Sequence, residues 1–157
     1  MNREMTVPSR LHLKRPCLLV QDLERSLSLY RDCLGFQLDY VGKADPDSYL
    51  YPVFRLPVTA ELRFAALSTD QEPRALALTE VKGSTLPSPT MPYRAATVIR
   101  VPSLVDTLPK LQTLGLIPIK ASSFSTPPNL KFTEQAVCDF DGHLLVLYEV
   151  QQQPPAP

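Results

Sequence analysis

The stretch CLLVQDLERSLSLYRDCLGFQLDYVGK, residues 17–43, decides the fold. It begins with a short apolar run, which is typical of a strand. Asp22 follows as a candidate helix N-cap, and Gly35 stands where the helix should end. Between them, apolar residues recur at helical spacing along one side, at Leu23, Leu27, Tyr30 and Leu34. We therefore expect a strand, a helix that covers a sheet, and a second strand.

The same pattern returns in the second half of the chain. The stretch VPSLVDTLPKLQTLGL, residues 101–116, aligns with VQDLERSLSLYRDCLGF, residues 20–36, after one deletion. Ser103 takes the place of Asp22 as N-cap, and Gly115 takes the place of Gly35. An internal repeat of this kind predicts two copies of one supersecondary unit.

Period-two or short apolar runs follow each helix and predict strands. In the first half they lie at residues 36–41, 51–56, 61–67 and 74–81, and in the second at 117–121, 131–140 and 143–150. Asp141-Gly142 separates the last two runs and is a hairpin signal. We therefore predict an α+β protein of two βαβββ modules, whose mostly antiparallel curved sheets form a cup with the helices outside.

Prolines mark the connections, because they remove backbone donors and favour extended chain. The chain has 17 prolines and 5 glycines, and the prolines cluster near the middle and at the C-terminus. The expected organisation is a flexible N-terminus (1–12), a first module (13–81), a Pro-rich linker (82–92), a second module (93–150) and a disordered tail (151–157).

The bulk composition limits the possible partners. Among 157 residues, 16 Lys and Arg balance 16 Asp and Glu, so no basic excess is available for a nucleic acid backbone. The sequence lacks a signal-peptide pattern and an apolar run of ~20 residues, so we expect a cytoplasmic protein that does not enter a membrane. Cys17, Cys33 and Cys138 are odd in number and widely spaced, which favours reduced thiols.

Two motifs resemble the vicinal oxygen chelate superfamily, which includes glyoxalase I, bleomycin resistance proteins and extradiol dioxygenases. The first is V-x-D-L-E-R-S-L-x-x-Y-R-D-x-L-G-F at residues 20–36, and the second is DFDGHLLVLYE at residues 139–149. The resemblance covers about residues 13–150. It implies a divalent metal held in the cup by His, Gln or Glu side chains from four strands.

Carried over residue by residue, the resemblance places the four ligands at positions that cannot bind such a metal. Arg15 lies seven residues before Asp22, and Ala96 lies seven before Ser103. Ala77 and Val146 take the two positions in the last strands of the modules. A guanidinium, two methyl groups and an isopropyl group offer no ligand atom, so we expect no metal and no cofactor.

Two other carboxylates are candidate metal ligands, but strand alternation places them on the face away from the cup. Glu80 and Glu149 each stand three residues beyond an empty position and should point outward, unless a β-bulge turns both strands. Ordinary solvated carboxylates are the competing interpretation. His12 and His143 are expected to face solvent.

Strand alternation predicts which residues line the cup. The expected ligand-binding residues combine apolar and hydrogen-bonding groups: Arg15, Cys17, Thr79, Val98, Arg100, Val146 and Tyr148. An arginine in an apolar cup suits a molecule with a carboxylate or similar anion. Alternatively, Arg15 and Arg100 reach the rim or form ion pairs with Glu61, Glu80 or Glu134. Cys17 is expected to be a buried thiol.

Two functions remain open at this point. One is a metal-free protein that binds or sequesters a small, partly apolar molecule, as bleomycin resistance proteins do. The other is an enzyme of the lyase, isomerase or dioxygenase type, with relocated metal ligands or with arginine, Tyr148 and Thr79 as hydrogen-bonding groups. A structural partner protein is a third possibility. The resemblance and the exposed sheet edges also imply a homodimer.

Overall fold

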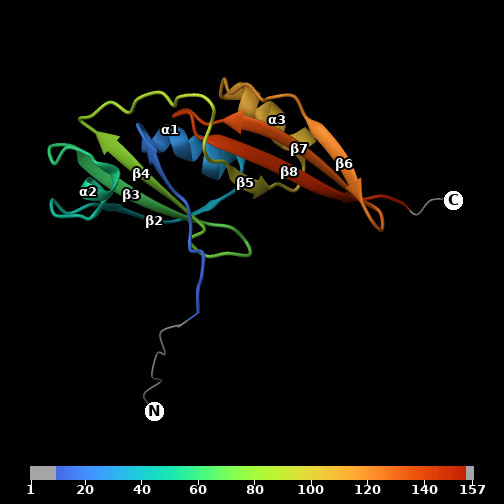
Figure 1. The fold of residues 1–157 in the computed structure, drawn as a ribbon, viewed down its shortest axis with the longest axis horizontal. Coiled ribbons are helices and arrows are strands. Elements are labelled where there is room, and N and C mark those ends of the chain that lie inside the picture. The colour runs from blue at the N-terminus through green and yellow to red at the C-terminus, as the bar shows by residue number, and fades with distance from the viewer. Residues whose placement is uncertain (1–9, 155–157) are drawn as a thin grey trace, which may run out of the picture.

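Two four-stranded sheets form the framework of the protein in the computed structural model, which describes residues 10–154 (Figure 1). The first sheet has the order β1-β4-β3-β2 and the second the order β5-β8-β7-β6. In each sheet the short first strand pairs in parallel with the last, and the other pairs are antiparallel. The strands are β1 (Cys17–Val20), β2 (Gln37–Lys43), β3 (Glu61–Ser68), β4 (Leu76–Lys82), β5 (Thr97–Arg100), β6 (Ser122–Thr126), β7 (Leu130–Cys138) and β8 (Leu144–Gln152). The predicted α+β class with two repeated modules is confirmed.

Each module carries its helix between its first two strands, as the repeat predicts. Helix α1 (Leu23–Leu27) runs on into η1 (Ser28–Cys33), and α3 (Leu104–Thr113) is the counterpart in the second module. The Asp22 side chain accepts the Arg25 N–H at 3.1 Å, and the Ser103 hydroxyl accepts the Asp106 N–H at 3.2 Å. Both predicted N-caps therefore start their helices.

The first helix differs from the expected α-helix because η1 is a π-helix. The predicted face is nevertheless buried, with Leu23, Leu27 and Tyr30 at most 1% exposed. Leu29 is also fully buried, although the 3.6-residue period places it off that face. Leu29 is buried because η1 also contacts α3 of the second module, so a second side of the helix lies in the shared core.

Two glutamates hold the helix N-termini to the sheets in the same way in both modules. The Glu80 carboxylate accepts the Leu23 N–H at 2.6 Å, and the Glu149 carboxylate accepts the Leu104 N–H at 3.0 Å. Both side chains point to the helix side of their sheets, opposite the face on which the resemblance places metal ligands. Glu80 is not a solvated carboxylate, however, because the residue is 3% exposed and receives two further hydrogen bonds from Arg63.

Three predicted strand assignments need correction. Residues 51–56 contain no strand, since Leu50–Phe54 forms the short helix α2, whose first turn tolerates Pro52. Residues 117–121 are irregular, and the strand begins only at Ser122. Strand β8 extends to Gln152 and so includes two residues of the expected tail. Residues 1–9 and 155–157 of the expected flexible ends lie outside the described residues.

The two modules share one hydrophobic core on the helix side of both sheets. It joins Leu27, Tyr30 and Leu78 of the first module to Leu111 and Leu147 of the second. Figure 1 shows α1 between the two sheets, with the connection of residues 83–96 crossing from one module to the other. The helices are therefore packed at the junction of the modules.

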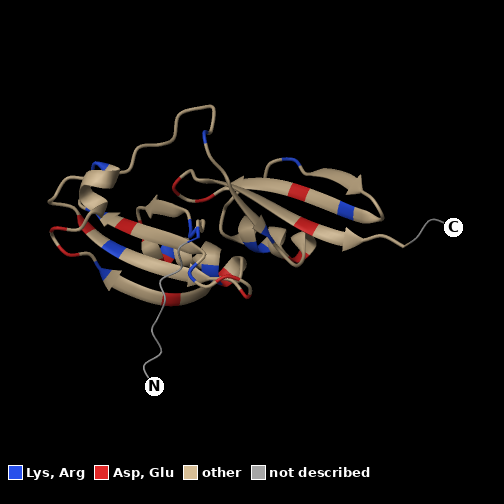
Figure 2. Cartoon of the chain, turned by 60° about the horizontal axis from the view of Figure 1, so that its bottom comes forward, with Lys and Arg blue, Asp and Glu red and all other residues tan. Residues whose placement is uncertain are grey.

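The surface carries charges of both signs. Figure 2 shows lysine and arginine interspersed with aspartate and glutamate over both modules. Within residues 10–154, no helix is long and apolar enough to cross a membrane.

The turn of residues 139–143 locks the second module to the first. The Tyr30 hydroxyl donates to the buried Asp139 carboxylate at 2.7 Å, and the Asp141 carboxylate accepts the Gln21 N–H at 2.9 Å. Nε2 of His143 lies 2.6 Å from the Leu19 carbonyl oxygen, within hydrogen-bonding distance. The prediction that His143 faces solvent is therefore wrong. These bonds join the end of β1 and the first helix to the β7–β8 turn.

Removal of the Tyr30 hydroxyl should weaken this junction. In Tyr30→Phe, one oxygen of the buried Asp139 loses its donor, and the free energy of unfolding should fall by about 1–3 kcal/mol. Urea denaturation measures the change, and Tyr49→Phe is the matched control because Tyr49 is 80% exposed. Equal stability of Tyr30→Phe and the wild type would show that the contact does not hold the modules together.

The Glu80 carboxylate should make stability depend on pH. Burial opposes its charged form, but the hydrogen bonds from Arg63 and the Leu23 N–H hold the pKa of Glu80 below its ordinary value. A lowered pKa adds stability above the ordinary glutamate pKa, and this contribution is lost as the pH falls through the folded-state pKa. Glu80→Gln should therefore cost about 2 kcal/mol at pH 7, and the difference from wild type should shrink below about pH 5.

Glu149→Gln is the matched control, because Glu149 holds the equivalent helix and has no ion pair within the described residues. Its effect at pH 7 should be smaller, because a single hydrogen bond is altered. The wild type and Glu80→Gln are compared from about pH 3 to 7, a range that contains glutamate titration in most folded proteins. A constant difference between Glu80→Gln and the wild type over this range would contradict the account.

Candidate functional site

The face of each sheet opposite α1 or α3 carries the predicted site residues, and we call it the inner face. On the first sheet, Cys17 pairs with Ala77 and Leu19 with Thr79. On the second, Val98 pairs with Val146 and Arg100 with Tyr148. The neighbours of these residues along the strands belong to the shared core, so the alternation places the predicted residues on the inner faces.

Arg15 lies over the inner face of the first sheet. Its guanidinium carbon is 5.9 Å from the centroid of the Phe64 ring, a distance typical of a cation–π contact. Its Nη1 donates to the Arg74 carbonyl at 3.3 Å. Within residues 10–154, Arg15 forms no ion pair with a carboxylate, and Glu80, one of the proposed partners, is bound to Arg63 instead.

The rest of the first inner face is covered from within the module. Tyr51 of α2 packs there with Leu62 and Val81, and its hydroxyl donates to the Ala60 carbonyl at 2.7 Å. Ala77 is fully buried and Thr79 is 1% exposed. The Thr79 hydroxyl is buried without a hydrogen-bond partner among the described residues. Exposed and partly exposed side chains on this face include those of Cys17, Leu19 and Phe64, toward the end where Arg15 lies.

Cys17 stands at that accessible end and is exposed, so the expectation of a buried thiol is wrong for it. The reason is its position at the first residue of a short edge strand, beyond the part of the sheet that α2 covers. Cys33 and Cys138 are partly buried, and the three cysteines are unpaired.

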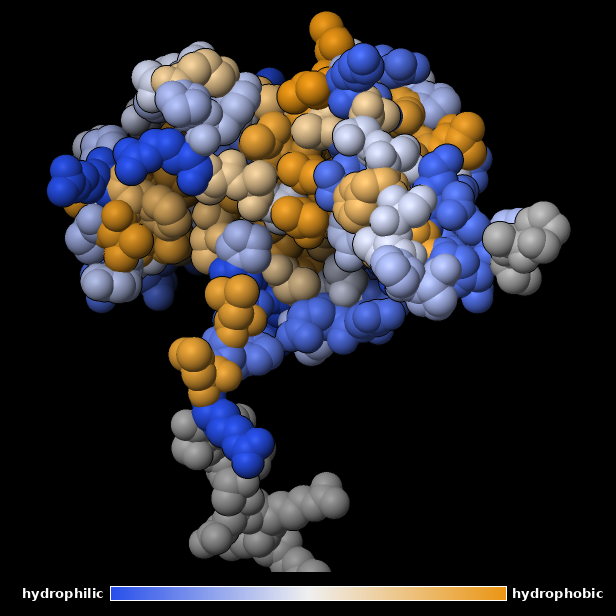
Figure 3. Space-filling model, turned by 45° about the vertical axis from the view of Figure 1, so that its right-hand side comes forward, coloured by the Kyte–Doolittle hydropathy of each residue, from blue (hydrophilic) through white to orange (hydrophobic). Residues whose placement is uncertain are grey.

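The inner face of the second sheet is more open. Val98 is 63% exposed and Arg100 is exposed, whereas Val146 and Tyr148 are partly buried. At the far end of this sheet, Phe124 and Phe132 stack with ring centroids 5.0 Å apart. The space-filling view also shows hydrophobic side chains gathered on the surface of the molecule (Figure 3).

The seven predicted site residues thus form two groups, one on each sheet. Within the described residues, no hydrogen bond or ion pair connects Arg15, Cys17 or Thr79 to the group on the second sheet. The strand pairing brings together the members of the second group: Val98, Arg100, Val146 and Tyr148.

The four positions implied for a metal do not fit one. Ala77 and Val146 lie on the inner faces, Ala96 precedes β5, and Arg15 brings a positive charge. Among residues 10–154, no group of three or more His, Cys, Asp and Glu side chains is arranged to hold a metal ion. The carboxylates of Glu80 and Glu149 are engaged with the helix N-termini.

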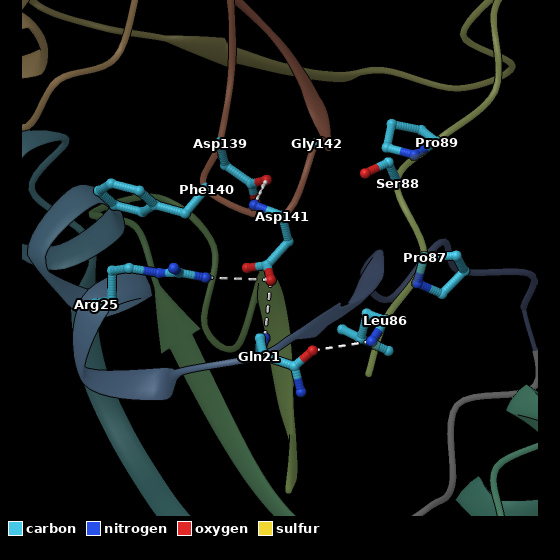
Figure 4. A pocket seen from close by; sticks show the side chains of 10 residues that line it. All are labelled: Gln21, Arg25, Leu86, Pro87, Ser88, Pro89, Asp139, Phe140, Asp141 and Gly142. Carbon is cyan, nitrogen blue, oxygen red and sulfur yellow. Dashed lines mark hydrogen bonds and ion pairs between the residues drawn. The ribbon is translucent and has the colours of Figure 1, made fainter. Parts of the chain in front are cut away.

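A cavity of about 400 Å³ lies at the junction of the modules, where sequence reasoning placed no site (Figure 4). Gln21 and Arg25 line it from the first module, Asp141 from the β7–β8 turn, and residues 86–89 from the linker. In the sequence, Asp141 belongs to a hairpin signal and to the second superfamily motif, and neither pattern predicts a cavity. A second cavity of about 390 Å³ lies beside α2 and is lined by Lys43, Asp45 and Tyr51, among others.

Comparison with known proteins identifies related folds. One solved structure, a glyoxalase family protein from Bacillus cereus, superposes with a TM-score of 0.69 at 14% identity and covers 93% of this chain and 98% of its own. Glyoxalase I from Leishmania major gives a TM-score of 0.61 at 17% identity, with coverage of 89% and 87%.

A fosfomycin resistance protein from Listeria monocytogenes, whose structure contains Mn(II) and sulfate, gives a TM-score of 0.53 at 16% identity, with coverage of 88% and 91%. These likenesses show the fold alone. The search of curated proteins yielded no significant sequence match.

A family model supplies the stronger result, since the Glyoxalase/Bleomycin resistance protein/Dioxygenase superfamily matches residues 11–147. That match spans most of both modules and includes the first motif and residues 139–147 of the second. The chain therefore belongs to the Glyoxalase/Bleomycin resistance protein/Dioxygenase superfamily.

Proposed function

We propose that this protein binds a small, partly apolar molecule with an acidic group, and that it does so without a metal. The observation that carries the proposal is Arg15, which takes the place of a metal ligand and lies over Phe64 on the inner face. Its guanidinium has no carboxylate partner within the described residues. A planar fork of donors in this position suits a carboxylate, which it can bind through two parallel hydrogen bonds.

The surroundings of Arg15 favour an aromatic or aliphatic body on the same ligand. Phe64 and Leu19 lie on the same face, and neither bears a charge. Tyr51 of α2 covers the part of this face around Leu62 and Val81. A ligand would therefore have to lie at the end near Arg15. A small acid is a better match than a long chain.

The proposal also includes the loss of the superfamily metal site. The chemistry of the four side chains supports it, because none of Arg15, Ala77, Ala96 and Val146 presents a neutral nitrogen, a carboxylate or a thiolate. An enzyme is the second candidate, and the unpartnered Thr79 hydroxyl on the inner face favours it.

We further propose that the protein acts as a homodimer in a reducing compartment such as the cytoplasm. The open inner face of the second sheet supports a dimer, since a second copy would cover Val98 and Phe124, which are 63% and 46% exposed. The three unpaired cysteines support a reducing environment.

Replacement of Arg15 tests the binding proposal. At millimolar concentrations, members of a panel of aromatic and aliphatic carboxylates should raise the melting temperature of the wild type, because a ligand of the folded state stabilises it. In Arg15→Met the same acids should bind about 10–100-fold more weakly, as expected for the loss of a charged hydrogen-bonding partner. The free energy of unfolding without ligand should change by no more than about 0.5 kcal/mol, because Arg15 is partly exposed.

Arg94→Met is the matched control, since Arg94 is an exposed linker residue, and it should keep the response to acids. The proposal would be contradicted if no acid stabilised the wild type. A loss of several kcal/mol in Arg15→Met would instead show that Arg15 is a structural residue.

A further inference from the structure

The cavity between the modules is separate from the inner faces and has its own chemistry. Three segments line it, and it is open to solvent on one side: the β1–α1 junction, the turn of residues 139–142 and the linker segment of residues 86–89. Its volume of about 400 Å³ falls within the usual range of small-molecule pockets. Figure 4 shows Asp141 reaching from the turn into the space between Arg25 and the linker.

Asp141 offers an acceptor that the protein leaves unused. Its side chain is 5% exposed. Its Oδ1 accepts the Gln21 N–H at 2.9 Å and lies 3.4 Å from an Arg25 nitrogen. Its Oδ2 is buried and has no hydrogen-bond partner in the described part of the chain. A buried carboxylate oxygen without a donor is unfavourable, so a ligand that supplies a donor would be stabilised here.

The neighbouring carboxylate is already satisfied. Asp139 accepts the N–H groups of Asp141 and His143 at Oδ1 and the Tyr30 hydroxyl at Oδ2. Arg25 forms an ion pair with Oδ1 of Asp141 at 3.4 Å, and its guanidinium also lies 5.1 Å from the centroid of the Phe140 ring and is in part exposed. Asp141 is therefore the acidic group with capacity for a further partner.

The linker wall of the cavity is rich in acceptors and poor in donors. Pro87 and Pro89 have no N–H, and the Leu86 N–H donates to the Gln21 side chain at 2.8 Å. Both donors of the Gln21 amide are engaged, since Nε2 donates to the carbonyls of Val81 and Ser84. What remains for a ligand is mainly the Asp141 carboxylate, carbonyl oxygens and the side chain of Ser88.

We propose that this cavity binds a small apolar molecule with a protonated primary amine, whose ammonium group donates to Asp141 Oδ2 after a rotation of this side chain turns the buried oxygen toward the cavity. The body of the ligand would lie against the apolar side chains of Leu86, Pro87 and Pro89. An organic cation fits better than a metal ion, because no group of three metal-ligating side chains occurs among residues 10–154. This site would take a basic ligand, whereas Arg15 would take an acidic one.

The electrostatics of Asp141 agree with a cationic ligand. Burial raises the pKa of Asp141, while the hydrogen bond from the Gln21 N–H and the nearby Arg25 act to lower it. A bound ammonium group would favour the charged carboxylate in the same way as Arg25 does. Such a ligand would also join the linker to the β7–β8 turn and so stabilise the junction of the modules.

Titration with benzylamine tests the proposal, with benzyl alcohol as the neutral analogue of similar shape. Isothermal titration calorimetry at pH 7 should show benzylamine binding at least tenfold more tightly than benzyl alcohol. In Asp141→Asn the amide oxygen can still accept the Gln21 N–H, but the charge is lost, so benzylamine affinity should fall at least tenfold. In Arg25→Gln a competing cation is removed, so the affinity should be equal or greater. Arg15→Met should bind benzylamine like the wild type, which separates this site from the acid site.

Three results would overturn the proposal: no binding of benzylamine below about 10 mM, equal affinity for benzyl alcohol, or unchanged benzylamine affinity in Asp141→Asn. If Asp141→Asn failed to fold, the wild-type comparison of amine and alcohol would still decide, together with Arg25→Gln. A loss of affinity in Arg25→Gln would show that the carboxylate is not the group that the amine contacts.

Discussion

The buried hydrogen bond between Tyr30 and Asp139 is the contact on which the arrangement of the two modules depends. Asp139 also holds the turn of residues 139–143 in shape by accepting two of its N–H groups, so one carboxylate fixes both the turn and its partner. Asp141 then accepts the Gln21 N–H at the start of the first helix. The helix sides of both sheets meet in one hydrophobic core, and the β7–β8 turn adds hydrogen bonds between the modules. This turn also forms one wall of the cavity at the junction.

The internal repeat explains how two similar units produce two different inner faces. Each module uses an N-cap, a helix and a glutamate from its last strand, Glu80 or Glu149, to fix the helix to the sheet. The difference comes from the connection between β2 and β3, where α2 covers the inner face of the first sheet. The second sheet has no such cover in the described part of the chain, and Val98 remains 63% exposed. The connection between β2 and β3, rather than the repeated framework, therefore determines how far each inner face is covered.

Much of the fold could be predicted because its signals are local. The caps at Asp22 and Ser103 and the alternation along β4 and β8 each depend on neighbouring residues.

The errors have tertiary causes. Residues 51–56 form a short, mostly apolar run that resembles a strand, but packing of Tyr51 against the sheet favours a short helix. His143 bonds to the Leu19 carbonyl of the other module, a contact that no local pattern indicates. The inner-face positions were predictable from strand register, whereas the cavity at Asp141 arises only when both modules are docked.

We propose that Arg15 on the inner face binds an anion at a position where other members of the superfamily hold a metal ligand. Native mass spectrometry tests it most directly, on protein purified without chelator and without a nickel column. The spectrum should show the mass of the polypeptide, or twice that mass for the dimer, with no added metal ion. Peaks shifted by one zinc, nickel, iron or manganese ion per chain, stable to buffer exchange and removed by chelator, would contradict the account.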